Sequence, residues 1–144
     1  MREIGKKIVF LGLLAVVLAA GRPAQAASTE VVWPAEKIVY KQVIPGVTKA
    51  VLSEDPTTGA YTSLTRFAGG VSNPLHTHTY DIKAVVISGT YNYGIDGQVV
   101  KLGPGSYALI PGGRQHTSGT DDKGCLFLEE SPGKFDINFV KAAK

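Results

Sequence analysis

The sequence predicts an all-β domain, either a sandwich or a barrel. Short segments rich in β-branched and aromatic residues recur along the chain, and turn residues such as Pro45-Gly46, Asp96-Gly97 and Gly103-Pro104-Gly105 separate them. After the first 30 residues, only the short tail at residues 139–144 has a pattern that fits a helix. Many short strands divided by Gly and Pro turns are typical of all-β folds.

The strands can be placed one by one from these turns. Asp96-Gly97 is a strong signal for a two-residue hairpin, because both residues tolerate the positive φ that such turns need. Residues 55–59 and 68–75 read as loops. We expect strands at residues 37–43, 47–54, 60–67, 76–80, 83–88, 90–95, 98–102, 106–110, 125–130 and 135–140.

The N-terminus has the pattern of a secretory signal peptide over residues 1–26. A basic start is followed by an apolar run at residues 8–20 and by the small-residue pattern Ala24-Gln25-Ala26. A membrane-spanning helix needs about 20 apolar residues, and this run is shorter. We therefore expect cleavage near Ala26, a periplasmic or secreted protein, and no stable membrane anchor after cleavage. Residues 27–36 would form an N-terminal arm, and residues 37–144 a single β-barrel domain.

The net charge argues against nucleic acid as a partner. The whole chain carries +3, and the predicted signal peptide alone contains four basic residues and one acidic residue. The rest of the chain is therefore close to neutral, which does not suit a polyanionic partner. Cys125 is the only cysteine, so an internal disulfide is excluded, and its apolar neighbours predict that it packs as a small hydrophobic residue.

The three histidines of the chain predict a metal site. His76 and His78 are two residues apart, so on a strand their side chains project from the same face. His116 follows a second segment, residues 105–115, that is rich in turn residues. Imidazole nitrogens bind divalent transition metals at about 2.0–2.1 Å, as they do in zinc sites.

The segments that carry these histidines resemble the two sequence motifs of the cupin superfamily. The residues that fit the first motif are Gly70, His76, His78 and Gly89, and those that fit the second are Gly105, Pro111, Gly113 and His116. The resemblance covers roughly residues 60–130. It implies a jelly-roll β-barrel, the double-stranded β-helix, with one metal ion on His76, His78 and His116. Residues 76–94 look like small exported cupins to which no activity is assigned.

The sequence departs from the cupin pattern at one metal ligand. The glutamate of the first motif is replaced by Ile82 or, with the longer spacing of that motif, by Lys83. Asp81 is a candidate for a displaced carboxylate ligand, although aspartate is also common in turns. Glu129-Glu130 reads as edge charge, with the alternative that one of the two points inward and replaces the missing ligand.

A site of three neutral imidazoles leaves the charge of a divalent ion uncompensated, so we expect it to favour small anionic, chelating ligands. Some cupin dioxygenases of thiols and of β-diketones are similar in lacking the glutamate. The resemblance therefore favours Fe or Mn, with Zn, Ni and Cu also suitable, and a non-haem oxygenase or related enzyme. Two alternatives stay open: a binding or sensing module without catalysis, and a scaffold with a vestigial site that forms a homodimer through a sheet edge.

Further pocket residues are suggested by strand alternation. Tyr91, Tyr93 and Tyr107 would face the cavity if they share a side with the histidines, and otherwise belong to the core. Arg66 and Lys83 are candidates for pairing with a substrate carboxylate, with a solvated surface charge as the alternative for each.

Overall fold

The structure is a computed structural model, and it describes residues 29–141. The predicted signal peptide lies outside the described residues. No helix within residues 29–141 is long and apolar enough to cross a membrane. The elements in order are η1 (Ala35–Lys37), β1 (Lys41–Ile44), β2 (Val47–Glu54), β3 (Tyr61–Phe67), β4 (Ser72–Thr77), β5 (Ile82–Ile95), β6 (Gln98–Leu102), β7 (Tyr107–Ile110), β8 (His116–Ser131) and β9 (Asn138–Phe139).

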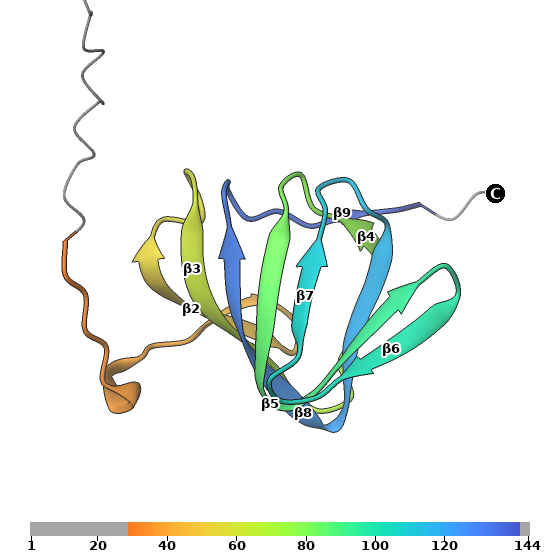
Figure 1. The fold of residues 1–144 in the computed structure, drawn as a ribbon, viewed down its shortest axis with the longest axis horizontal. Helices are drawn as coiled ribbons and strands as arrows, with labels where there is room; N and C mark the ends of the chain where they lie inside the picture. The colour runs from red at the N-terminus through yellow and green to blue at the C-terminus, as the bar shows by residue number, and fades with distance from the viewer. Residues whose placement is uncertain (1–28, 142–144) are drawn as a thin grey trace, which may run out of the picture.

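Two long strands, β5 and β8, organise the fold by running through both of its faces. The first half of β5 pairs with β7 and with the second half of β8, which also pairs with β3. The second half of β5 pairs with β6 and with the first half of β8, which also pairs with β4. All pairs are antiparallel, and Figure 1 shows the sheet curling into a barrel. The predicted all-β fold is confirmed.

A glycine makes the bend of β5 possible. Gly89 has φ 73°, a region that favours glycine, and the β5–β8 register shifts on both sides of it. A Cβ at this position would lie 2.0 Å from the carbonyl oxygen of Gly124 on β8. No side chain fits there, which explains why the strand turns its corner at a glycine.

The core lies between the two halves of the curled sheet and is formed by alternate strand residues. In β5 the inward residues Ile82, Ala84 and Val86 are buried, and the residues between them are exposed. The core cluster also contains Cys125. The predicted packing of this cysteine is confirmed.

The strand predictions hold for most elements, and several of the predicted spans differ from the structure. β1 begins at Lys41 and not at residue 37, β8 begins at His116 and not at residue 125, and β9 covers only Asn138–Phe139 of the expected 135–140. Asp96 and Gly97 both have positive φ and form the predicted hairpin between β5 and β6. The pieces expected at 83–88 and 90–95 are one strand, because a glycine corner bends a strand without ending it. The strand expected at 76–80 is displaced to Ser72–Thr77, and residue 139 of the helix-like tail lies in β9.

Candidate metal centre

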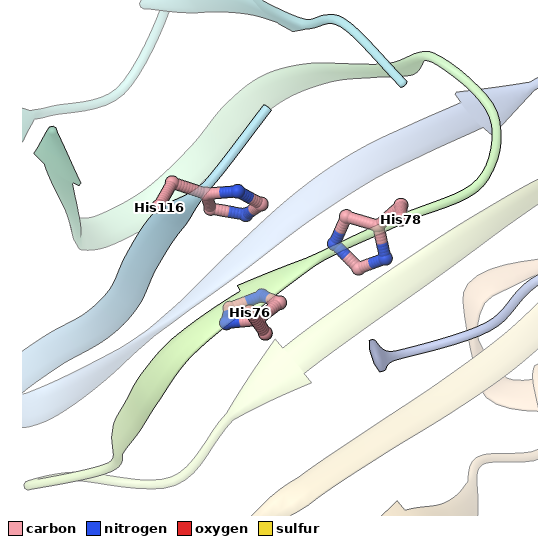
Figure 2. Close-up of side chains that lie close together, drawn as sticks. All are labelled: His76, His78 and His116. Carbon is pink, nitrogen blue, oxygen red and sulfur yellow. The ribbon is translucent and has the colours of Figure 1, made fainter. Parts of the chain in front are cut away.

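The fold brings the three histidines together from two neighbouring strands. His76 on β4 and His116 at the start of β8 are cross-strand partners, and His78 lies just past the end of β4. One ligand nitrogen from each ring lies within 4.8 Å of the others. Figure 2 shows the three rings gathered at one place. The pairing of β4 with β8 therefore brings His76 and His78 next to His116, which is far from them in the sequence.

Backbone carbonyls fix the orientation of all three rings. His76 Nδ1 lies 2.7 Å from the oxygen of Pro74, His78 Nδ1 lies 2.5 Å from that of Asp136, and His116 Nδ1 lies 3.0 Å from that of Arg114. A carbonyl oxygen only accepts, so each Nδ1 carries the proton and donates it. Each Nε2 is then left with a free lone pair, which is the state that a metal ligand requires.

His116 is the histidine whose surroundings best suit a metal ligand. Its side chain is fully buried, and its Nε2 has no hydrogen-bond partner among the described residues. Buried polar atoms without partners are rare, because each costs free energy. Burial lowers the pKa of His116 to about 4 and also lowers the pKa of His76. Both imidazoles are therefore neutral at pH 7, and the donor set fits a divalent transition metal.

A small cavity lies against two of the three histidines. It has a volume of about 40 Å³, and its wall includes His76, His78 and Tyr91. Most of the other lining side chains are apolar, among them Val47, Phe67, Ile82, Ala84, Ile110 and Phe127. A water molecule needs roughly 10–15 Å³ of such volume, so the cavity holds water or a molecule of the size of O₂. An organic compound does not fit without movement.

A buried ion pair forms another part of the cavity wall. Lys49 Nζ lies 2.6 Å from Glu129 Oε1, and both side chains are almost completely buried. Glu129 also accepts hydrogen bonds from the hydroxyls of Thr65, at 2.7 Å, and of Tyr61. Lys49 donates to Ser63 and Thr65 as well.

The electrostatics of this pair favour the ionised carboxylate. Burial alone would raise the pKa of Glu129, but the charge of Lys49 and the hydrogen bonds that the carboxylate accepts lower it overall. Burial lowers the pKa of Lys49, and its attraction to Glu129 opposes that shift. Because Glu129 is fully engaged by these partners, it is not available as the missing fourth metal ligand.

The C-terminal segment, residues 134–140, crosses the end of the barrel beside the histidines; we call it the C-terminal strap (Figure 1). The backbone carbonyl of Asp136 accepts a hydrogen bond from His78 Nδ1, and its carboxylate accepts hydrogen bonds from the backbone N–H and the hydroxyl of Thr79. β9 pairs with β4 at His76, and the ring of Phe139 lies 6.1 Å from that of His76. The strap therefore holds two of the three histidines in place.

Phe135 of the strap separates the small cavity from the outside. Its ring lies 5.9 Å from that of His78, and the ammonium of Lys49 lies 4.3 Å from the centre of the same ring. Phe135 and Lys49 also line an open groove of about 820 Å³ that contains Lys41 and Lys134. The side chain of Phe135 therefore stands between the histidine cavity and a groove large enough for an organic molecule.

The candidate pocket residues are placed differently from one another. Tyr91 is buried and lines the cavity, where it also packs in the aromatic core. Tyr93 is half-buried, with its ring 5.5 Å from that of His116. Asp81 is exposed and outside the histidine cluster, and its carboxylate accepts a hydrogen bond from the backbone of Gly112. It acts as a turn residue here.

Three other candidates lie on the outer surface. Tyr107 is 58 % exposed and is not a pocket residue, because Ile110, three residues on, points inward and odd spacing on a strand reverses the side. Arg66 is exposed and stacks over the ring of Tyr40, and Lys83 is exposed on β5. Neither cation faces the cavity.

Sequence reasoning missed Lys49 and Phe135 and left Glu129 undecided. Strand alternation indicates that Glu129 points inward, because Cys125 and Phe127 lie four and two residues before it on β8 and both are buried. The same parity directs Glu130 outward. For Lys49 the parity with Val47 was available, but a lysine on a strand is usually exposed. Nothing in the local sequence indicates that Phe135 packs against a histidine.

The sequence matches one family over most of its length. The family model of the ChrR cupin-like domain matches residues 28–132, which includes both histidine segments. The chain belongs to this cupin family. The cupin resemblance is thereby confirmed, and no curated protein is similar enough in sequence to give a match.

Solved structures share the fold of this chain at low sequence identity. The polyketide cyclase RemF from Streptomyces resistomycificus has a TM-score of 0.69 and 20% identity, over 81% of this chain and 89% of its own. KdgF from a Halomonas species has a TM-score of 0.64 and 17% identity, over 76% and 97%. A variant of salicylate 1,2-dioxygenase from Pseudoaminobacter salicylatoxidans, in complex with gentisate, has a TM-score of 0.55 and 15% identity, over 62% and 26%. These similarities confirm the cupin jelly roll.

Proposed function

We propose that this cupin binds one divalent transition metal ion, Fe or Mn, through Nε2 of His76, His78 and His116. The observation that carries the proposal is the buried, unpartnered Nε2 of His116 beside two rings whose Nδ1–H groups donate hydrogen bonds to backbone carbonyls. A vestigial site would be expected to satisfy these nitrogens by other protein groups. We further propose that this metal site catalyses a reaction of a small anionic, chelating compound, as a non-haem oxygenase or a related enzyme.

The metal would supply Lewis acidity and a binding position for substrate and O₂. The protein groups have separate tasks. The carbonyls of Pro74, Asp136 and Arg114 hold the ligand tautomers, and the apolar wall excludes all but a few waters. In the described part of the chain no carboxylate joins the histidine group, so the ligands bring no negative charge. An anionic substrate would supply that charge itself.

Access for such a substrate would come from the open groove. The groove has a mixed charge, because Lys41 and Lys134 line it together with Glu54, Asp55 and Asp136. The two lysines would be the contacts for an anionic group that enters beside Phe135. Displacement of the Phe135 ring would join the groove to the histidine cavity. The chemistry of other cupins is consistent with several reaction types, since the similar structures named above include a cyclase and a dioxygenase.

A binding or sensing module without turnover is the second candidate. The observation that favours it is the cavity volume of about 40 Å³, which has no room for an organic substrate as the strap stands. In this case the metal would be held with water or a small anion, and the barrel would respond by a change in stability.

The two candidates are separated by an oxygen-consumption assay on protein whose metal has been replaced. We would remove metal with a chelator, reload with Fe(II), Mn(II) or Zn(II) without oxygen, and add β-diketones, thiol carboxylates and hydroxy acids one at a time. Catalysis predicts oxygen uptake with Fe or Mn, none with Zn, and none in His116→Ala. Asp81→Asn is the matched control, because Asp81 lies near the site but outside it. Metal binding without uptake of oxygen or loss of any of these compounds would favour the binding module.

We also propose that the protein is exported and cleaved near Ala26. The support is the order of basic start, apolar run and Ala24-Gln25-Ala26 in the sequence. Intact-mass measurement on the protein from its host tests this. A mass that corresponds to a chain starting at Ala27 is expected, and a chain that keeps residues 1–26 would contradict the proposal.

A further inference from the structure

Lys49 and Phe135 are the two residues that line both the histidine cavity and the open groove. Among the residues that the structure describes, Lys49 is also the one lysine or arginine in the wall of the cavity. Arg66 and Lys83, the cations that the sequence suggested as partners of a substrate carboxylate, do not line it. Lys49 is therefore the cation that a molecule entering from the groove would meet beside the histidines.

Stability alone does not explain why Lys49 is buried. Its partner Glu129 is buried with it, and both charges have lost their water. A buried ion pair is often no more stable than two well-packed apolar residues of the same volume, because the loss of hydration offsets the attraction. Buried charged groups in the wall of a cavity are, in contrast, typical of functional sites. The position of this pair therefore indicates a role toward a ligand.

The ring of Phe135 lies beside both Lys49 and the histidines. Lys49 Nζ is 4.3 Å from the centre of this ring, where the ring attracts the cation, and the ring centre of His78 is 5.9 Å from it. A group of the size of one ring, in the place of Phe135, would therefore lie next to the ammonium and to His78 at once. The hydrogen bond from Lys49 to Ser63 is long, at 3.4 Å, so one N–H of the ammonium is weakly held and can turn to a ligand oxygen.

The balance of charge at the site indicates the charge of that ligand. Lys49 and Glu129 cancel each other, and a divalent ion on three neutral imidazoles leaves two positive charges. A ligand with two negative charges makes the buried site neutral, which is the arrangement that costs least where water is excluded. We propose that Lys49 determines specificity by binding a carboxylate at the end of the ligand remote from the metal. This inference rests on the proposed metal function. The ligand class is a compound about as long as one ring, with a chelating group at one end and a carboxylate at the other.

Two probes that share one chelating group test the role of Lys49 on the full protein loaded with Co(II) in the absence of oxygen. They are the monohydroxamate of succinic acid and the same compound with its carboxylate converted to an amide, and the visible cobalt bands report their binding. The carboxylate probe is expected to bind at least about tenfold more tightly, because charge-assisted hydrogen bonds are the stronger ones. Lys49→Met/Glu129→Leu should lose this preference while both probes still shift the bands. That variant keeps the net charge of the pair, so the loss reports a local contact. The matched control is Lys134→Met, which changes a lysine of the groove outside the cavity wall and should keep the preference.

Phe135→Ala tests the place of the ligand without a change to the ion pair. Both probes should bind this variant at least about tenfold more tightly, because no ring has to be displaced, and the preference for the carboxylate should remain. Unchanged affinities in Phe135→Ala would contradict the place assigned to the ligand. Equal affinity of the wild type for the two probes, with the cobalt bands present, would overturn the role of Lys49 and leave the metal proposal standing. A preference lost in Lys134→Met but kept in Lys49→Met/Glu129→Leu would place the carboxylate in the groove and overturn it as well. Absence of cobalt bands would refute the metal site and this inference together.

Discussion

Removal of one partner from the buried Lys49–Glu129 pair is expected to destabilise the barrel more than removal of both. Glu129→Leu leaves the ammonium of Lys49 buried with only hydroxyl partners, and Lys49→Met leaves the carboxylate without its cation. Both side chains are at most 5% exposed, so water cannot compensate. Breaking a buried pair in this way costs about 3–5 kcal/mol.

The double variant Lys49→Met/Glu129→Leu is expected to lose less. It removes both charges and fills their volume with apolar atoms, which is often neutral or stabilising. Three hydroxyls, those of Tyr61, Ser63 and Thr65, lose their charged partners and must bond to one another or to water. Because unsatisfied polar groups cost about 1–3 kcal/mol each, we expect a net loss of about 1–2 kcal/mol if most of them find new partners.

Urea unfolding of the metal-free protein measures all four free energies of unfolding in one double-mutant cycle. Metal must be absent because a ligand of the native state adds its own stabilisation. The two single variants should each lose about 3–5 kcal/mol, with a coupling energy of at least about 3 kcal/mol. Single losses below about 1 kcal/mol, or a double variant equal to the sum of the singles, would refute the view that this pair is fully desolvated.

Three further predictions test other parts of the account. The wild-type protein is expected to be more stable than Glu129→Gln above pH 4.5, the ordinary pKa of the carboxyl group, and to lose this advantage as the pH falls through the lowered pKa of Glu129 in the folded protein. Thermal melts between pH 7 and pH 3 measure the difference in stability. A difference that does not change with pH would contradict the prediction. Gly89→Ala should lower the free energy of unfolding in urea by about 3 kcal/mol or more. Gly97→Ala is the control, because Gly97 has a similar φ but open space around it, and it should lower this free energy by only about 1–2 kcal/mol. Equal losses would show that the close approach of β8 does not require a glycine at position 89. Phe135→Ala should speed the removal of bound Co(II) by a chelator at least about tenfold, and Phe139→Ala should leave this rate nearly unchanged; the opposite order would place the entrance at Phe139.

The fold was predictable because its signals are local. Alternation of apolar residues, Gly and Pro turns and the Asp96-Gly97 hairpin need no knowledge of distant contacts. The ends of strands were less predictable. β4 begins at Ser72 because it pairs with β8, and that pairing depends on residues more than forty positions away.

The candidate site was predictable in its histidines and, through strand alternation, in Tyr91. Their spacing and the two cupin motifs indicated a shared site, and strand pairing between β4 and β8 brings them together. The Lys49–Glu129 pair was not predictable, since its members are 80 residues apart and each alone resembles a surface charge. Phe135 and Asp136 act through tertiary contacts of a segment with almost no regular structure, which no local pattern encodes.

Cobalt titration of the metal-free protein tests the central claim most directly. Co(II) bound by three imidazoles gives visible absorption bands, so stoichiometry and affinity can be read from the same spectrum. We expect saturation at one equivalent, with loss of the bands in His116→Ala and their retention in Asp81→Asn. Absence of bands in the wild-type protein, or an unchanged spectrum in His116→Ala, would show that the three histidines do not form a metal site.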